Sequence, residues 1–499
     1  MIERQVFSVR SSGILMHISS LPSPGGIGSM GQEAYDFADF LQASGMTIWQ
    51  VLPVGPTGYG ESPYQSSSVF AGNPLLISCA RLRDEGLLQY EDEEEFQPED
   101  PETVDYESVR RNKEMLLHRC FEQSAGKLSG QISEFVSLNP WVGDFALFTA
   151  IKNYFNRVMW TKWPDEAIRF RRPDAVKKYS ELLNREIEYH IFCQYLFRRQ
   201  WFDLKKYCND RSILLFGDMP IYVAEDSADT WTHPEIFQLD RNLIPKRVAG
   251  VPPDYFSENG QLWGNPLYRW TYLRFFRNFD WWVDRMRGMA ELYDMIRIDH
   301  FIGFANYYSV KHGMPDARNG KWVVGPGKSL FKCLNREVPG IRIIAEDLGC
   351  VNARVRRLLD WCGYPGMKVL TFGFDSDESN PHFIGHYEKN TVAYTGTHDN
   401  DTTLGWAEKA NPKALAFAEK TLGFSGAAEA PDAFIRALFK SPCDTVIIPM
   451  QDILGLGGPA RMNYPGTIGG NWIWRMKPDQ LSLELSMKYY RLNRQTERG

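Results

Sequence analysis

The stretch Met295-Ile296-Arg297-Ile298-Asp299 is a short apolar run that ends in an acidic residue, and it is one of eight short apolar runs in the sequence. Each is rich in branched apolar side chains and stops at a polar or glycine-containing loop, as strands buried on both faces do. The runs cover residues 14–18, 48–52, 213–219, 295–299, 341–346, 367–372, 391–395 and 445–450. Helical patterns separate most of them. Eight alternating strand and helix units predict an α/β fold, a single (β/α)8 TIM barrel spanning residues 1–499.

One connection is far longer than the others. Residues 53–210 separate the second and third predicted strands and are too long for a simple loop. They contain amphipathic helical patterns over residues 108–122, 146–158 and 185–207. We therefore predict a large, mainly helical subdomain inserted into the barrel at this point.

Bulk properties exclude several classes of protein. The net charge of -6 provides no basic field for nucleic acid, and no run of about 18 apolar residues indicates a membrane span. The eight cysteines are scattered between Cys79 and Cys443 without a C-x-x-C motif. They indicate free thiols in a reducing cytoplasm rather than a disulfide framework. We expect a cytoplasmic protein with no nucleic-acid or membrane partner.

Acidic residues lie at or shortly after the ends of four predicted strands. They are Asp218, Asp299, Glu346 and, after the seventh strand, Asp399. Because catalytic groups of parallel barrels lie where strands end, these acids are expected on one rim. Acids on neighbouring strands, which lie about 4.8 Å apart, would approach the roughly 5–5.5 Å separation of a retaining glycosidase. A single acid at such a position is more often a helix cap. Four acids on one rim favour catalysis.

The two central acids differ in their sequence surroundings. Arg297 precedes Asp299 by two residues and so lies on the same face of the strand, where it would keep that carboxylate ionised. Glu346 has no cation beside it in its own strand, which suits a raised pKa and an acid/base role.

These motifs resemble those of a known family. The order Asp218, Arg297-x-Asp299-His300, Glu346-Asp347 and His398-Asp399 is similar to the four motif regions of the α-amylase clan. The chain more closely resembles the 4-α-glucanotransferase (amylomaltase, or disproportionating enzyme) family. That resemblance runs from about residue 11 to 475 and is carried by Gly13–Pro22, Trp49–Gly55, Tyr59–Gln65, Pro220–Val223, Gly250–Phe256 and Asn471-Trp472.

The resemblance implies transfer of 1,4-α-glucan segments between glucans or maltooligosaccharides, with no cofactor and no metal. Asp299 would be the nucleophile that forms a covalent glucosyl-enzyme, Glu346 the acid/base, and Asp399 the third carboxylate. Residues 245–268 would form an active-site loop that covers the acceptor and excludes water. The implied substrate-binding residues are Tyr59, Asp218, Tyr255, Phe256, Gln261, Trp263, Arg297, His300, His398 and Asn471.

One position departs from the family pattern. Many relatives have an arginine two residues after the histidine of the fourth strand, where this chain has Ile302. The preferred donor length is therefore open. Two other functions also remain open, an amylase-like hydrolase and a glucan-binding protein with an inactive barrel. The presence of all three carboxylates argues against the inactive barrel.

Overall fold

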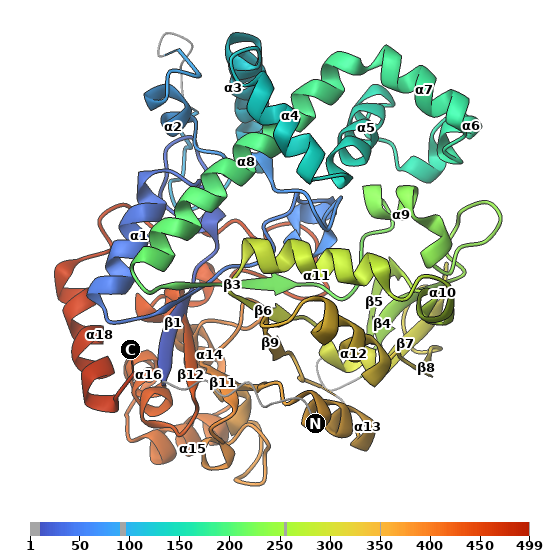
Figure 1. Ribbon diagram of the computed structural model, residues 1–499. Helices are drawn as coiled ribbons and strands as arrows, with labels where there is room; N and C mark the ends of the chain where they lie inside the picture. Colours follow the sequence, from blue (N-terminus) through green and yellow to red (C-terminus); the bar gives the residue numbers. More distant parts are fainter. Residues whose placement is uncertain (1–9, 90–95, 254–256, 350, 499) are drawn as a thin grey trace.

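A computed structural model describes residues 10–89, 96–253, 257–349 and 351–498. Eight parallel strands form the central sheet (Figure 1), ordered β10-β11-β12-β1-β2-β3-β6-β9. They are β1 (Ser11–Leu15), β2 (Ile48–Gln50), β3 (Leu214–Met219), β6 (Met295–Ile298), β9 (Arg342–Ala345), β10 (Gly366–Val369), β11 (Thr391–Tyr394) and β12 (Thr445–Pro449). The order around the sheet follows the chain. The predicted TIM barrel with its helical insertion between the second and third strands is confirmed.

The barrel closes between β9 and β10 without a regular ladder. The Ala345 N–H donates to the Pro365 carbonyl at 2.9 Å, and the Met367 N–H donates to Asp347 Oδ1 at 2.7 Å. A carboxylate therefore takes the place of a main-chain acceptor at this seam, and Asp347 belongs to the barrel wall.

The first strand lies earlier than predicted. β1 begins at Ser11, whereas Ile18 belongs to a 3-10 turn, Ile18–Ser20. A search for apolar runs missed this start because Ser11, Ser12 and Gly13 are not apolar. Gly13 is required there, since a Cβ would lie 2.3 Å from the Ile48 carbonyl oxygen of the neighbouring strand.

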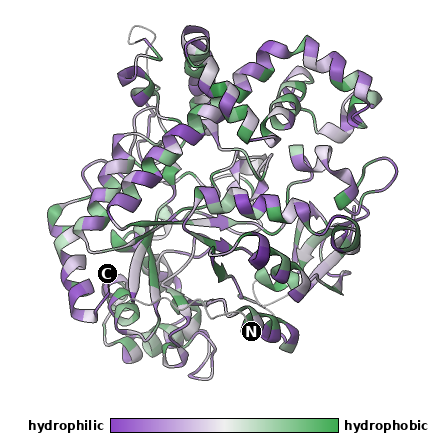
Figure 2. Ribbon diagram, in the orientation of Figure 1, coloured by the Kyte–Doolittle hydropathy of each residue, from purple (hydrophilic) through white to green (hydrophobic). Residues whose placement is uncertain are grey.

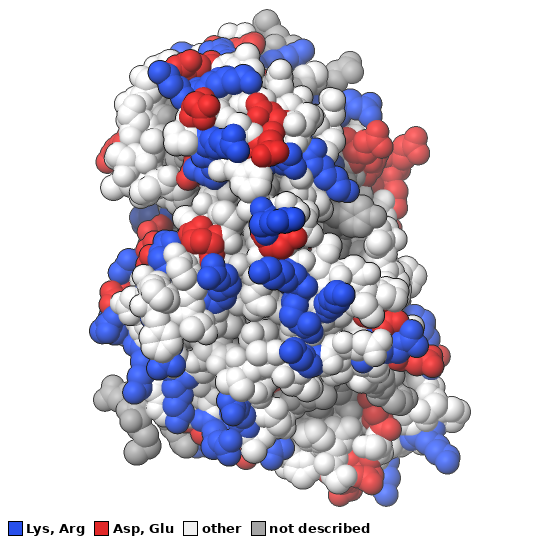
Figure 3. Space-filling view, turned by 90° about the vertical axis from the view of Figure 1, so that its right-hand side faces the viewer, with Lys and Arg blue, Asp and Glu red and all other residues white. Residues whose placement is uncertain are grey.

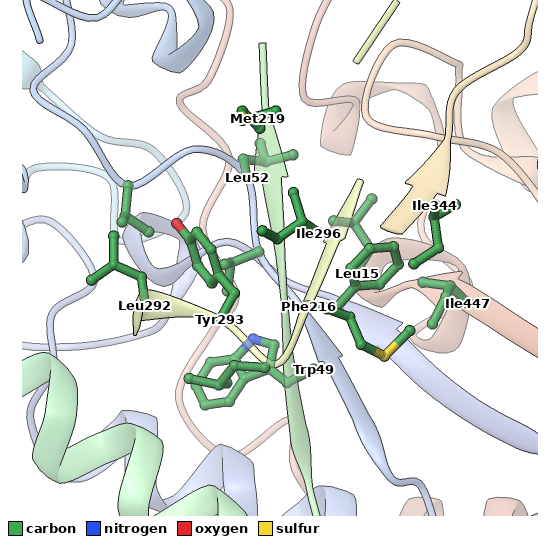
Figure 4. Close-up of a cluster of buried hydrophobic side chains, with 14 of the residues drawn as sticks. Leu15, Trp49, Leu52, Phe216, Met219, Leu292, Tyr293, Ile296, Ile344 and Ile447 are labelled. Carbon is green, nitrogen blue, oxygen red and sulfur yellow. The ribbon is translucent and has the colours of Figure 1, made fainter. Parts of the chain in front are cut away.

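Large apolar side chains from neighbouring strands fill the core. Figure 4 shows Trp49, Phe216 and Ile296 converging with Tyr293 in one cluster, and all four are buried. The Tyr293 ring lies so close to β3 that a Cβ at Gly217 would come within 2.3 Å of it. Each such side chain contributes about 1.5–3 kcal/mol on burial, so this packing holds the barrel together.

The segment between β2 and β3 is mainly helical and lies above the barrel in Figure 1. Two glutamines of its longest helix, α8 (Asn184–Asp210), lie against the segment after β2. Each glutamine hydrogen-bonds to both the main-chain N–H and the main-chain carbonyl of one residue there. Gln194 pairs with Gly72 at 2.8 and 2.9 Å, and Gln200 pairs with Ser78 at 2.8 and 3.0 Å. The helices are α2 (Cys79–Asp84), α3 (Tyr106–Ser124), α4 (Ser129–Leu138), α5 (Trp141–Tyr154), α6 (Glu166–Arg169), α7 (Pro173–Leu182) and α8 (Asn184–Asp210).

The remaining helices pack around the barrel. In Figure 2 the longer helices carry hydrophilic and hydrophobic residues along the same ribbon, as expected for helices with one face on a core. They are α1 (Gln32–Ala43), α9 (Ala228–Thr232), α10 (Trp270–Phe276), α11 (Asp280–Leu292), α12 (Lys328–Glu337), α13 (Ala353–Cys362), α14 (Thr403–Lys409), α15 (Pro412–Leu422), α16 (Ala430–Lys440), α17 (Met450–Ile453) and α18 (Leu483–Thr496).

A second, antiparallel sheet was not predicted. Its order is β5-β4-β7-β8, and it lies to the right of the barrel in Figure 1. Two of its strands come from the predicted loop region 245–268. Each of the four strands mixes polar or glycine residues with apolar ones, so a search for apolar runs does not find them. The strands are β4 (Arg247–Val251), β5 (Gln261–Pro266), β7 (Asn306–Lys311) and β8 (Lys321–Val324).

The cysteines of the described residues are free, and the face shown in Figure 3 carries charges of both signs. The seven cysteines within the described residues are all free and buried. No helix of the described residues is long and apolar enough to cross a membrane. On the face shown in Figure 3, positive and negative side chains are interspersed with large uncharged areas.

Arg498 offers a test of the packing at the lower end of the barrel. Its buried guanidinium donates to the carbonyls of Phe439, Cys443 and Ser11 at 2.8, 2.8 and 3.2 Å. R498M would remove these three hydrogen bonds from a buried cation, so we expect it to destabilise the protein by about 2–4 kcal/mol. Thermal unfolding followed by calorimetry would measure the change. The exposed neighbour variant R494M should unfold like the wild type, and equal midpoints for both variants would refute this account.

Candidate active site

Asp299 and Glu346 lie side by side at the carboxyl ends of β6 and β9. Ile298 and Ala345 are paired in register, and the two acids are the next residues of each strand. The Glu346 N–H donates to the Ile298 carbonyl at 3.1 Å, and the Phe301 N–H donates to the Glu346 carbonyl at 3.0 Å. The ladder thus continues past the two acids.

Arg297 connects two carboxylates on neighbouring strands. Its guanidinium lies 2.6 Å from Asp218 Oδ2 and 2.9 Å from Asp299 Oδ1. Burial works against its charge, but Asp218 and Asp299 hold the pKa of Arg297 well above its usual value. A permanent cation therefore lies beside Asp299, whose side chain is 29% exposed, while that of Asp218 is fully buried.

Glu346 has a different environment. Its carboxyl accepts the His300 N–H at 2.7 Å and the Leu348 N–H at 2.8 Å. Burial raises the pKa of Glu346 to about 8, and the negative charge of Asp299 adds to this rise against the opposing effect of Arg297. Desolvation outweighs the amide hydrogen bonds, which favour the ionised form. At neutral pH Glu346 holds a proton that it can donate.

His398 and Asp399 lie on the same rim, after β11. Asp399 Oδ1 lies 3.4 Å from His398 Nε2 and accepts the Asn463 amide at 2.6 Å. The side chain of Asp399 is 45% exposed. His398 stacks on Tyr64 with ring centres 5.0 Å apart, and the Tyr64 hydroxyl donates to Asp218 Oδ2 at 2.7 Å. Tyr64 therefore connects Asp218 to His398.

His300 has left-handed backbone, with φ of 51°. This conformation directs its N–H toward Glu346, and the imidazole lies edge-on to Trp263 with ring centres 4.8 Å apart. Burial lowers the pKa of His300 to about 4, so the ring is neutral at pH 7. The Trp263 indole donates to Gln261 Oε1 at 3.1 Å, so the predicted residues Gln261, Trp263 and His300 form one wall.

The remaining predicted residues have other contacts, or lie outside the described part of the chain. The Asn471 amide hydrogen-bonds within its own loop, to Tyr464 and Thr467. Tyr59 begins the 3-10 turn Tyr59–Glu61. Tyr255 and Phe256 lie outside the described residues. Ile302, at the departing position, is buried in the 3-10 turn Phe301–Phe304.

Sequence reasoning missed the contacts of Tyr64, Asn463 and Trp472. Tyr64 and Trp472 were part of the family-like stretches, but no pattern indicated that their rings flank His398, with Trp472 at 5.8 Å. Asn463 carried no signal at all.

Two hollows border this cluster. His398 and Arg461 help to line one, with about 450 Å³ of atom-free space, and Tyr64 and Asp218 help to line the other, with about 500 Å³. Asp299 and Glu346 line neither of these two. Among the described residues, no three acidic, histidine or cysteine side chains gather as a metal site would require. The arrangement offers a proton donor, Glu346, next to a carboxyl that pairs with a cation, Asp299.

Comparisons with known proteins agree with this chemistry. The family described as 4-alpha-glucanotransferase matches residues 16–482. The 4-alpha-glucanotransferases of Clostridium butyricum and Thermus thermophilus are each 43% identical; the alignments cover 96% and 98% of this chain and 99% of each relative. The structure of amylomaltase from Streptococcus agalactiae in complex with acarbose is 40% identical, with a TM-score of 0.95 over 98% of this chain and all of that one. The chain belongs to the 4-alpha-glucanotransferase family.

Proposed function

We propose that this protein moves 1,4-α-glucan segments from a donor glucan or maltooligosaccharide to the 4-hydroxyl of an acceptor glucan or glucose by a retaining double displacement. The observation that carries the mechanism is the pairing of Asp299 and Glu346 on adjacent strand ends, one beside a cation and one buried with a raised pKa. This division matches a retaining mechanism, which needs an ionised nucleophile and a protonated acid. The buried free thiols are in keeping with a cytoplasmic enzyme.

In the first step Asp299 attacks the anomeric carbon of the donor and forms a covalent glucosyl-enzyme. Glu346 gives its proton to the leaving glycosidic oxygen, and the shortened glucan departs. In the second step Glu346, now ionised, takes the proton of the acceptor hydroxyl, which attacks the anomeric carbon and releases Asp299. The initial protonation states are thereby restored.

The surrounding residues bind the sugar and hold the carboxylates. Asp218 holds Arg297, which forms an ion pair with Asp299. Asp399, partly exposed beside His398, grips sugar hydroxyls in the distorted ring, and Tyr59 stacks under the transferred glucose. The 245–268 region, with Gln261 and Trp263, Tyr255 and Phe256, covers the acceptor and excludes water, which favours transfer over hydrolysis.

Maltotriose as the sole substrate tests the activity. Transfer predicts free glucose together with a ladder of longer maltooligosaccharides, separated by chromatography, because one molecule acts as donor and another as acceptor. A rise in reducing ends without any product longer than maltotriose would identify a hydrolase. No turnover with glucan still bound would identify a binding protein.

D299N tests the nucleophile. Asparagine keeps the shape of the side chain but is too weak a nucleophile to form the covalent intermediate, so we expect kcat to fall on the order of 10⁴-fold or more. Calorimetry should still detect maltotriose binding. D360N removes an exposed carboxylate from α13 and should retain wild-type turnover. Turnover of D299N at the wild-type rate would assign the nucleophile to another residue.

The pH dependence tests the acid. The pKa of Glu346 is raised to about 8 and its protonated form starts the reaction, so kcat/KM should fall as the pH rises through about 8. A glycosyl fluoride donor needs no proton on its leaving group, and the first step with this donor should lose that alkaline limb. A profile with maltotriose that stays flat to pH 10 would exclude Glu346 as the acid.

A further inference from the structure

Besides His300, two non-glycine residues near the proposed site have left-handed backbone. They are Glu61, with φ of 59°, and Trp472, with φ of 64°. Side chains other than glycine avoid this conformation, and it persists only where surrounding contacts enforce it. The two residues are far apart in the sequence, yet the turns that carry them approach each other, since a Cβ at Gly60 would lie 3.9 Å from the Ile468 side chain.

Helix α3 of the inserted segment holds both turns. The Arg110 guanidinium donates to both carboxylate oxygens of Glu61, at 3.0 and 2.8 Å. The buried Tyr106 hydroxyl donates to the Trp472 carbonyl at 2.9 Å. Tyr106 and Arg110 are four residues apart and therefore share one face of the helix. The Thr57 hydroxyl adds a third bond to Glu61, at 2.9 Å.

Both turns carry side chains of the proposed sugar site. Glu61 lies between Tyr59 and Tyr64, and Tyr64 contacts Asp218 and stacks on His398. The Trp472 ring centre lies 5.8 Å from both Tyr64 and His398. Tyr64, His398 and Trp472 thus form one aromatic wall, which we call the ring wall. Its three rings come from three loops, and the loops of Tyr64 and Trp472 meet on α3.

We propose that Tyr106 and Arg110 are positioning residues that hold the two left-handed turns and so preorganise the ring wall for glucan binding. The inserted segment thereby serves the barrel site, and this inference rests on the proposed function. The ion pair is suited to the task because one guanidinium nitrogen, Arg110 Nη2, contacts both carboxylate oxygens, and because the Glu61 and Arg110 side chains are only 25% and 28% exposed.

The effect should appear in binding. Without these bonds the turns would relax toward ordinary backbone conformations, and only the fraction with an ordered ring wall would bind sugar tightly. The apparent Kd then equals the Kd of the ordered form divided by the fraction of molecules in that form. Once sugar is bound, the carboxylates face it as before, so the chemical step should hardly change.

The test measures maltotriose affinity by calorimetry in a D299N background, where no turnover interferes. R110Q and Y106F should each raise Kd about five- to thirty-fold. E61Q should act like R110Q, and the double variant E61Q/R110Q should be no weaker than either single variant, because one pair is lost in all three. With Asp299 restored, R110Q should raise KM by a similar factor and keep kcat within about two-fold.

R111Q is the matched control, since Arg111 is the next residue of α3, is 76% exposed and pairs along its own helix with Glu107. It should leave Kd unchanged. The proposal is overturned if R110Q and Y106F lower the unfolding temperature but leave Kd at its D299N value, or if R111Q weakens binding as much. If R110Q does not fold, the Kd of Y106F, which lacks only the hydroxyl oxygen, tests the proposal by itself. Failure of the active enzyme to lengthen maltotriose would refute the proposed function, while the Kd series would still test this inference.

Discussion

The ion-pair chain from Asp218 through Arg297 to Asp299 is the interaction on which the site depends. It spans the ends of two neighbouring strands, and Arg297 and Asp218 are almost completely buried. Burial raises the pKa of Asp218, and the adjacent guanidinium of Arg297 opposes that rise. Removal of Arg297 would leave two neighbouring acids without a cation, one of them fully buried. The same ion pairs hold the ends of β3 and β6 together and place the cation beside the partly exposed Asp299.

The neighbouring carboxyl of Glu346 has a raised pKa, although Arg297 also acts on it. Glu346 is buried and feels Asp299 as a like charge, and these effects exceed the attraction of Arg297. Two acids on adjacent strands thus have different surroundings, because Asp299 is partly exposed beside the cation and Glu346 is shielded by the turn at His300. The left-handed backbone at His300 is part of this arrangement, since it turns an N–H onto Glu346.

The parts of the fold that could be predicted are the barrel strands, because each of them is a local run of apolar residues in the sequence. Runs such as 213–219 and 295–299 are buried on both faces, so composition alone indicates strands, and the acids that end them follow directly. The antiparallel sheet escaped notice because strands such as Arg247–Val251 and Lys321–Val324 mix polar and apolar residues. The role of Tyr64 escaped notice because its partners, Asp218 and His398, are 154 and 334 residues away in the chain, and only the folded barrel brings them together.

The seam between β9 and β10 has a further consequence. Asp347, whose carboxylate replaces a missing ladder acceptor there, shares a peptide bond with Glu346. Closing the barrel and orienting the proton donor are therefore tasks of adjacent residues on one short, stiff piece of backbone. A shift of register at this junction would open the wall and displace the donor in a single event. The pair leaves almost no room for insertions or deletions, so variation in loop length must be accommodated elsewhere on the rim.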